Sequence, residues 1–296
     1  MTIVESALQR LKNARGAEPE KRQPASPQPG ESLPATRAHP RIPAPVRWPT
    51  HLPAADFDQA RLEAAGLYPP ERFVRRLRDE YRAIRREVVG ASLEKLAATG
   101  QAVGPIVAVT SAGPGEGKSY TSLNLALSIA GQGEHDVLLI DADFVKRTIS
   151  VACNLGDRPG LAELLGQPAA SFFDYAYPTR TPRLRILPAG TSSSTQDLFA
   201  PARVAAVFEA IRTALAEHIV IVDTPPILVS TDTPAVLDVA GQVLLVVRAG
   251  KSLQDAVREA LRRIRKTLPV GVILNDWSPL LPSEKKTYTS GNEYTL

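Results

Sequence analysis

The chain has 296 residues, of which 44% are hydrophobic and 22% are charged, and its formal net charge is +4. This length allows one large or two small globular domains, and so small a positive charge gives no reason to expect nucleic-acid binding. With one cysteine, Cys153, the chain cannot form an intramolecular disulfide, and it has no zinc-binding spacing. Its longest apolar runs are too short to cross a bilayer, and we expect a protein of a reducing compartment without a signal peptide.

The N-terminal part of the sequence predicts little globular structure. An apolar stripe over residues 2–14 predicts a short amphipathic helix, which we assign to residues 1–14. Ten of the 26 prolines precede residue 56, and we expect residues 15–56 to form a disordered linker. The stripe of the predicted helix consists of Ile3, Val4, Ala7, Leu8 and Leu11.

Two further elements precede the main fold. Residues 57–66 predict a brief ordered element, and residues 71–97 predict a long helix with a basic face. A row of arginines is typical of a solvated helix surface and also fits a contact between subunits, so both interpretations stay open. The basic face carries Arg72, Arg75, Arg76, Arg78, Arg82, Arg85 and Arg86.

From residue 104 onward, strand and helix patterns alternate. This alternation is typical of an α/β fold with a mostly parallel sheet that helices cover on both faces. Ligands of such sheets bind at the carboxyl ends of the strands, so polar residues there are candidates for a site. Strands are predicted at 106–110, 137–141, 184–187, 219–223, 243–248 and 270–275. Helices are predicted near 118–131, 202–217 and 252–267.

A glycine-rich loop joins the first of these strands to the first helix. Residues 110–119 read TSAGPGEGKS, the spacing of a phosphate-binding P-loop, with Ala112 in place of the first glycine. Glycines let the backbone wrap closely around a phosphate, and the following helix N-terminus favours an anion. We expect Lys118 to reach the β- and γ-phosphates and the Ser119 hydroxyl to bind Mg²⁺. The residues assigned to nucleotide binding here are Gly113, Pro114, Gly115, Glu116, Gly117, Lys118, Ser119 and Tyr120.

Polar side chains also follow later strands. Asp141 and Asp143 stand at the end of the second strand, and Asp223 ends a later one. Since Mg²⁺ prefers oxygen ligands, we expect these aspartates to converge with Ser119 on one metal–phosphate site. Each aspartate by itself also fits a helix cap or a turn. Asn275 ends the last strand and offers the donor and acceptor that suit an adenine edge, with a turn position as the alternative.

The final residues, 281–296, show no apolar periodicity. They contain two of the seven tyrosines, Tyr288 and Tyr294. We expect a flexible tail that can place a phenol in another active site, and the alternative is an inert chain end.

Together these motifs resemble the bacterial protein tyrosine autokinases, which control the polymerisation and export of capsular and exopolysaccharides. The resemblance covers roughly residues 71–278 and implies a P-loop NTPase kinase domain, which we place at 57–280. The matching segments are TSAGPGEGKS at 110–119, SLNLA at 122–126, LIDAD at 139–143, PGLAELL at 159–165, VDTPP at 222–226, TD at 231–232, VVRAG at 246–250 and VILN at 272–275.

The resemblance implies a role for each site residue. Lys118 would stabilise the transferring phosphoryl group of ATP. Ser119 and Asp223 would hold Mg²⁺ directly or through water. Asp141 would contact Mg²⁺ and is placed to take the proton of the acceptor tyrosine, with support from Asp143.

The resemblance also implies acceptors and self-association. Tyr288 and Tyr294 would be the autophosphorylation sites. Asp79, Arg82 and Arg85 follow the spacing of a family helix motif that mediates ring-like self-association, with aspartate in place of glutamate.

A membrane-embedded polysaccharide co-polymerase is the partner that the resemblance implies, and no nucleic acid is expected. The protein would then be cytoplasmic and peripherally associated with the inner membrane through that partner. The N-terminal helix and the segment RLEAAG at 61–66 resemble the branch linked to exosortase exopolysaccharide loci.

Two other functions remain compatible with the sequence. Partitioning and septum-positioning ATPases of the ParA/MinD type share these motifs, but their loop carries an additional lysine where this chain has Gly113. The other is a weakly catalytic ATP-binding scaffold of an export complex. The sparse tyrosines favour it, as does the absence of the family's usual arginine after Asp143, a charge that Lys146 or Arg147 is expected to supply.

Overall fold

The computed structural model describes Val46 and residues 48–99, 106–191 and 198–276, without the side chains of 92–99. The helix predicted over 1–14, most of the predicted linker, and the tail with Tyr288 and Tyr294 therefore lie outside the described residues. The described ranges belong to a unit that begins at Val46.

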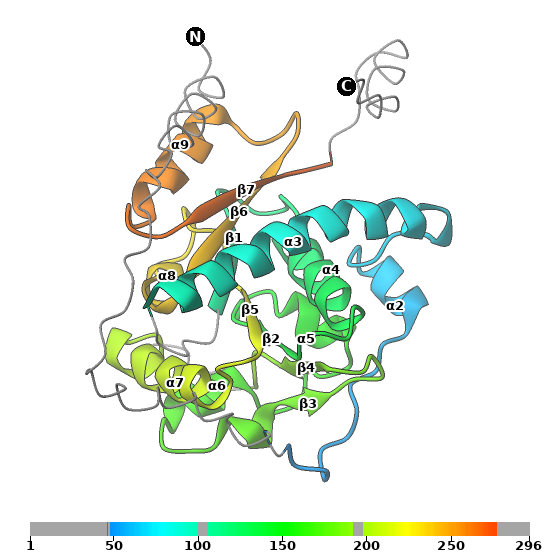
Figure 1. Cartoon of the computed structure of the whole chain (residues 1–296), viewed down its shortest axis with the longest axis vertical. Coiled ribbons are helices and arrows are strands. Elements are labelled where there is room, and N and C mark those ends of the chain that lie inside the picture. The colour runs from blue at the N-terminus through cyan, green and yellow to red at the C-terminus, as the bar shows by residue number, and fades with distance from the viewer. Residues whose placement is uncertain (1–45, 47, 100–105, 192–197, 277–296) are drawn as a thin grey trace, which may run out of the picture. The chain divides into compact units, whose positions relative to one another are not determined.

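Seven strands form one sheet in the order β3-β4-β2-β5-β1-β6-β7 (Figure 1). Every neighbouring pair is parallel except β3 and β4, which are antiparallel. All residues of β1, β2 and β5 are buried because helices cover both faces of the centre. The predicted α/β P-loop fold and all six predicted strands are confirmed. The strands are β1 (Ile106–Ser111), β2 (Val137–Asp141), β3 (Tyr177–Pro178), β4 (Leu184–Leu187), β5 (Ile219–Asp223), β6 (Gln242–Arg248) and β7 (Val270–Asn275).

One face of the sheet packs against the helix that follows the P-loop and against the long basic helix. Leu123, Leu125 and Ile129 of the first of these helices are completely or almost completely buried, beside Val107 and Leu139 of the sheet. The apolar spacing in the sequence is thus satisfied by one shared core. The helices on this face are α2 (Gln59–Ala64), α3 (Val74–Thr99), α4 (Lys118–Ala130) and α5 (Thr148–Ala152), and a short 3-10 helix, η1 (Glu71–Phe73), precedes α3.

The opposite face carries a second core. Phe208 and Ile211 of one helix are fully buried against Val220 and Val222 of β5. Three of the elements on this face, α6, α8 and η2, were not predicted from the sequence. They are too short to show two turns of apolar periodicity. The elements are α6 (Leu161–Gly166), η2 (Phe172–Tyr175), α7 (Pro201–Ala214), α8 (Thr233–Val239) and α9 (Gln254–Arg263).

The long helix α3 confirms the prediction of a basic helix in this region. It buries Leu77, Tyr81 and Val88 toward α4, while its arginines lie mostly at the surface. Arg85 is an exception, since it donates a hydrogen bond from Nη1 to the carbonyl of Ser128 at 2.9 Å. Among the described residues, no helix is both long and apolar enough to cross a membrane.

The prediction of a disordered linker over residues 15–56 is wrong for the carboxyl end of this segment. Trp48 packs edge-on against Phe173 at 5.0 Å, and the guanidinium of Arg185 lies 4.5 Å from its ring centre. The amide of Ala55 donates to the carbonyl of Pro178 at 2.7 Å, which extends the sheet edge at β3. The folded unit therefore begins about ten residues before the predicted boundary at residue 57. The contacts of Trp48 stabilise this segment although its composition is rich in proline.

Candidate active site

The P-loop turns from β1 into α4 at the carboxyl edge of the sheet. Gly117 precedes the helix with φ of 99°, a left-handed conformation that favours glycine. The side chain of Asn275 also lies close to this position, and a Cβ here would displace its amide group. Asn275 donates a hydrogen bond to the carbonyl of Glu116 at 3.0 Å. The last strand and the loop are thereby in direct contact, as expected for a shared nucleotide site.

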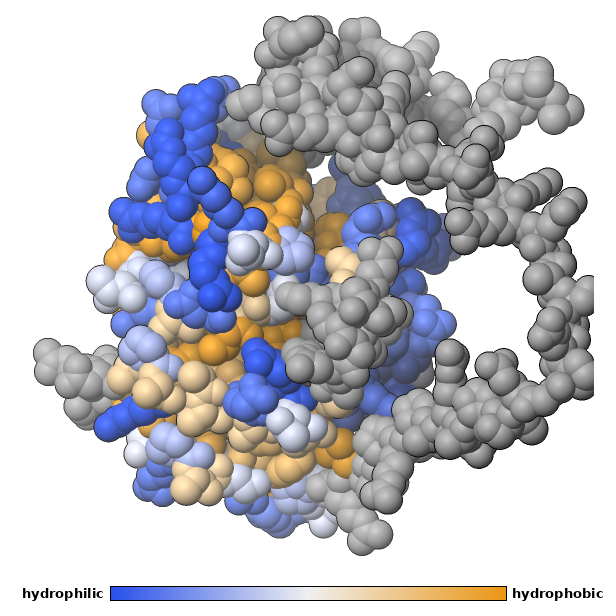
Figure 2. Space-filling model, turned by 60° about the vertical axis from the view of Figure 1, so that its left-hand side comes forward, coloured by the Kyte–Doolittle hydropathy of each residue, from blue (hydrophilic) through white to orange (hydrophobic). Residues whose placement is uncertain are grey.

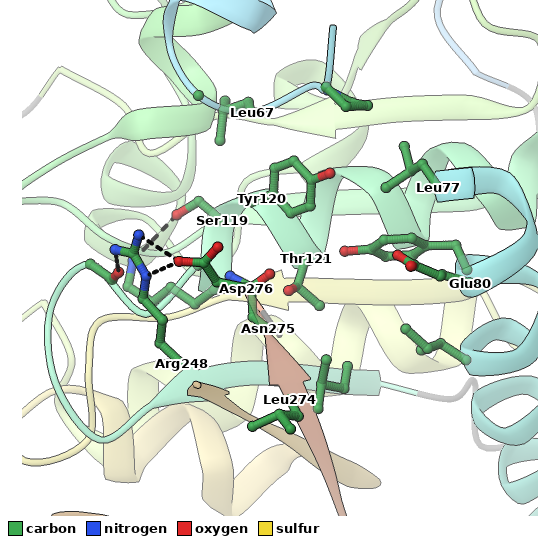
Figure 3. Close-up of a pocket in the computed structure, with 18 of the residues that line it drawn as sticks. Leu67, Leu77, Glu80, Ser119, Tyr120, Thr121, Arg248, Leu274, Asn275 and Asp276 are labelled. Carbon is green, nitrogen blue, oxygen red and sulfur yellow. Dashed lines mark hydrogen bonds and ion pairs between the residues drawn. The ribbon is translucent and has the colours of Figure 1, made fainter. Parts of the chain in front are cut away.

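Side chains from distant segments hold the loop in shape. The carboxylate of Glu116 accepts hydrogen bonds from the amide of Gly113 at 3.0 Å and from the hydroxyl of Ser252. Arg248, at the end of β6, donates to the carbonyl of Gly115 at 3.0 Å and forms an ion pair with Asp276 (Figure 3). These contacts fix the backbone before any ligand binds, which lowers the entropy lost on binding.

Lys118 lies at the centre of a buried polar cluster that it forms with Asp143, Ser119 and Asp223. Its Nζ is 2.8 Å from Oδ2 of Asp143, 3.3 Å from Oγ of Ser119 and 4.0 Å from Oδ2 of Asp223. Burial lowers the pKa of this ammonium, but the charges of Asp223, Asp143 and Asp141 outweigh burial, so the pKa is raised. Lys118 therefore carries its positive charge at neutral pH.

Two of the predicted carboxylates lie side by side because their strands are neighbours. Asp141 of β2 pairs in register with Asp223 of β5, and both side chains are fully buried. Ser119 donates a hydrogen bond to Oδ2 of Asp223 at 2.6 Å, and Oγ of Ser122 lies 3.0 Å from its Oδ1. The structure thus brings together Asp141, Asp223 and Ser119, as predicted from their positions at strand ends.

Asp141 accepts three hydrogen bonds. Ser150 donates from its hydroxyl at 2.7 Å and from its amide at 2.9 Å, and the amide of Asp143 donates at 3.2 Å. Burial, followed by the charge of Asp223, raises the pKa of Asp141 to about 7, although these hydrogen bonds lower it. Burial likewise raises the pKa of Asp223, against the charge of Lys118.

The donor set fits a hard divalent cation. The three buried carboxyl groups of Asp141, Asp143 and Asp223 surround one buried ammonium group, that of Lys118. The negative charge that Lys118 does not neutralise would be compensated by Mg²⁺. Within the described ranges, however, no group of three or more His, Cys, Asp or Glu residues could hold a metal ion. A metal here would depend on the Ser119 hydroxyl, on water and on phosphate oxygens, which is how Mg²⁺ is usually bound.

A cavity of about 750 Å³ opens beside this cluster. Its walls come from the first turn of α4, from α3 and from the ends of β6 and β7, as Figure 3 shows. Tyr120 lies on the wall, and burial, followed by the charge of Glu80, raises the pKa of its phenol to about 12. Tyr81 stands nearby, with its ring 6.5 Å from that of Tyr120.

The predicted candidates fall into three groups. The loop residues 113–120, the three aspartates and Asn275 gather at this edge of the sheet. Of the two cations after Asp143, Lys146 lines the cavity. Arg147 instead donates to the carbonyls of Gly156 and Gly190 at 3.3 and 3.2 Å. Tyr288 and Tyr294 lie outside the described residues.

Several participating residues were missed from the sequence. Ser150 orients Asp141, and Ser252 and Asp276 complete the network around the loop. Arg248 lies within a matched segment but had no assigned role. Its position at the carboxyl end of a predicted strand was the available signal.

The sequence is similar to curated bacterial proteins, although no family model matches it. It is 33% identical over 202 residues to the tyrosine-protein kinase YwqD of Bacillus subtilis, which covers 67% of this chain and 80% of that protein. It is also 33% identical over 176 residues to the succinoglycan biosynthesis transport protein ExoP of Rhizobium meliloti. That match covers 57% of this chain but 22% of ExoP, so this chain corresponds to a small part of the longer protein.

The fold is likewise similar to solved kinase domains. The crystal structure of the VpsO kinase domain superposes with a TM-score of 0.55 at 31% identity, over 70% of this chain and 99% of that one. The P-loop, the aspartates at the strand ends and the match to YwqD over most of its length agree with one another. The chain therefore belongs to the family of bacterial tyrosine-protein kinases.

Proposed function

We propose that this kinase transfers the γ-phosphate of Mg-ATP to Tyr288 and Tyr294 in the tail of a second copy of the chain. The observation that carries this proposal is the buried cluster of Lys118, Asp143, Asp223 and Ser119 beside a preshaped P-loop. Phosphoryl transfer depends on positioning and on neutralising charge, and this cluster supplies both.

Each residue of the cluster has a task that its contacts support. Lys118 would exchange Asp143 for phosphate oxygens, because its ammonium is charged and already lies next to the loop. Ser119 and Asp223 would hold Mg²⁺ directly or through water, which in turn withdraws charge from the phosphates. Asn275 would contact the adenine, since it borders the cavity at the end of β7.

Asp141 would accept the proton of the incoming tyrosine. A general base works best when its pKa lies near the working pH, and the pKa of Asp141 is raised to about 7. Hydrogen bonds from Ser150 and from the amide of Asp143 fix the plane of the carboxylate. A fixed and partly basic carboxylate suits proton transfer better than a mobile one.

The acceptor tyrosines would come from a neighbouring copy. Asp79 and Arg82 support self-association through α3, because their side chains are 74% and 72% exposed and lie 4.0 Å apart, too far for a strong ion pair. Arg85 belongs to the same face. We propose that this face contacts a second chain and brings its tail within reach of the active site.

The cellular role would be in exopolysaccharide production and export. The support is the name of ExoP, a succinoglycan biosynthesis transport protein, and its similarity to this chain. We propose a membrane-embedded co-polymerase as the partner and a peripheral position at the inner membrane. Co-fractionation with membranes in cells with and without the co-polymerase would test this arrangement.

The experiment that tests the kinase proposal uses ATP labelled in the γ-phosphate. The full chain should label its own tyrosines with Mg²⁺ present, and Lys118→Met should abolish labelling because the phosphates lose their cation. Lys266→Met, at an exposed lysine between α9 and β7, is the matched control and should label normally. Undiminished phosphotyrosine in Lys118→Met would overturn the proposal.

A second variant tests the acceptors. Tyr288→Phe/Tyr294→Phe should keep nucleotide binding and lose most of the label, as measured by mass spectrometry of tryptic peptides. Label at other tyrosines would show that the tail assignment is wrong. Nucleotide binding without any labelling would instead favour an ATP-binding scaffold.

A further inference from the structure

A second cavity, of about 580 Å³, adjoins the nucleotide cavity along α3. The side chains of Leu77 and Tyr81 line both cavities and so separate them. The other walls of the second cavity come from α2, from α4 and from the turn between β3 and β4. None of the residues that touch nucleotide phosphates in the proposed function line it.

The rim of this cavity is strongly basic. Arg78, Arg82 and Arg85 are spaced by four and three residues, so they share one face of α3, and Arg180 joins them from the β3–β4 turn. No acidic residue is among the described residues that line the cavity. The structure therefore concentrates four guanidinium groups around one opening.

Two of these guanidinium groups are available for a ligand. The guanidinium groups of Arg78 and Arg180 make no hydrogen bond and no ion pair with any residue that the structure describes. Arg85 uses one donor on the carbonyl of Ser128, and Arg82 lies 4.0 Å from Asp79. Positive charges held close together without counter-ions repel one another and destabilise the cavity when no ligand is bound. A doubly charged anion would reduce this repulsion.

The interior of the cavity is apolar and aromatic, unlike its rim. Leu62, Leu77 and Tyr81 are almost fully buried at its wall, and Tyr68 and Leu127 also line it. One polar atom there is unsatisfied, since Oδ1 of Asn124 is buried without a hydrogen-bond partner among the described residues. The Nδ2 atom of the same amide is occupied by the carbonyls of Leu67 and Tyr120.

We propose that this cavity binds phosphotyrosine. A phenyl ring would occupy the apolar interior while its phosphate meets Arg78 and Arg180, because a guanidinium group can donate two parallel hydrogen bonds to phosphate oxygens. A bare phosphate or a phosphoserine would leave the interior unfilled and bind more weakly.

The tail of the chain is the natural source of this ligand, and this step rests on the proposed function. Asp276, the last described residue before the tail, lines the neighbouring nucleotide cavity. The twelve residues 277–288 can span up to about 40 Å when extended, and the two cavities share a wall. Tethering raises the local concentration of a phosphorylated tail at the cavity.

Binding is tested with synthetic peptides and the full-length Tyr288→Phe/Tyr294→Phe chain, which cannot supply its own ligand from the tail. Fluorescein-labelled peptides of residues 281–296 carry phosphotyrosine at position 288, unmodified tyrosine at 288, or phosphoserine at position 290. Fluorescence anisotropy should show that the phosphotyrosine peptide binds at least about tenfold more tightly than either control. Equal binding of the phosphotyrosine and unmodified peptides would overturn the proposal, and equal binding of the phosphoserine peptide would reduce the cavity to a general anion site.

Matched arginine variants place the binding in this cavity. Arg78→Gln/Arg180→Gln removes two rim charges, and affinity for the phosphotyrosine peptide should fall about tenfold or more. Arg75→Gln/Arg86→Gln removes the same charge from exposed positions of α3 outside the cavity and should change affinity less than twofold. Equal losses in both variants would show non-specific attraction, and no loss in either would place the peptide elsewhere, for example in the nucleotide cavity.

The outcome does not depend on catalysis. Because the phosphate is introduced by synthesis, a chain that failed to label its own tyrosines would still bind the peptide through the arginine rim. Failure of autophosphorylation and failure of this proposal are therefore distinguishable.

Discussion

The hydroxyl of Ser150 donates a hydrogen bond to Oδ2 of Asp141 at 2.7 Å, and the Ser150 amide donates to the same oxygen. The same hydroxyl oxygen accepts a hydrogen bond from the amide of Ala189, two residues after β4. Ser150 thus connects the proposed catalytic base to the neighbouring strand. A carboxylate held from two sides keeps one orientation toward the active site.

Replacing Ser150 tests whether this orientation matters. Ser150→Ala should lower kcat for tyrosine phosphorylation about tenfold, since a hydrogen bond to a charged group contributes about 1.5–3 kcal/mol. The KM for ATP should change little because Asp141 does not form the phosphate loop. Ser150→Thr keeps the hydroxyl and should restore most of the activity, whereas equal loss in both variants would indicate a packing defect.

The raised pKa of Asp141 predicts a pH dependence of stability. Burial, together with the charge of Asp223, raises this pKa from 3.8 to about 7. Between about pH 4 and pH 7, the folded chain keeps a proton on Asp141 that the unfolded chain has lost. The free energy of unfolding without nucleotide should therefore decrease as pH rises through this window, by up to about 1.4 kcal/mol per pH unit.

The contribution of Asp141 can be isolated by comparison with Asp141→Asn. Burial lowers the pKa of His218, so this residue gives the opposite slope near its ordinary value of 6.5. That slope is common to both proteins and cancels in their difference. Urea unfolding at several pH values should give a flatter profile for Asp141→Asn, and parallel profiles would contradict the raised pKa.

Arg248 should support nucleotide binding without touching the nucleotide. It holds the carbonyl of Gly115 and the carboxylate of Asp276, so Arg248→Ala removes one of the contacts that hold the P-loop against β6 and β7. We expect about a tenfold rise in the Kd for Mg-ADP, measured by titration with a fluorescent analogue. Arg258→Ala on α9, where Arg258 pairs with exposed Asp255, serves as the control. Unchanged affinity in Arg248→Ala would show that the loop holds its shape without this arginine.

Trp48 should anchor the start of the folded unit. Its ring packs against Phe172, Phe173 and Arg185, and Trp48→Ala should reduce the free energy of unfolding by about 2 kcal/mol. Deleting residues 1–45 should leave the unfolding temperature unchanged, whereas deleting residues 1–56 should lower it. Equal unfolding temperatures for both truncated chains would show that the segment around Trp48 contributes nothing to stability.

The sequence alone determined six of the seven strands, all except β3, together with the P-loop and the aspartates at the strand ends. Runs of Val, Ile and Leu in β1, β2 and β5 are buried on both faces, so their limits follow from local composition. The loop at 110–119 requires its glycines locally, as the left-handed backbone of Gly117 shows. Information carried by neighbouring residues was sufficient for these features.

The tertiary structure alone decided which of these features meet. Asp141 and Asp223 are neighbours because β5 lies beside β2, a strand order that no local pattern contains. Arg248 reaches Gly115 across 133 residues of sequence, and Trp48 gains order within a proline-rich segment from rings far along the chain. Such contacts depend on how strands and helices pack, and packing energy is shared among residues that are distant in sequence.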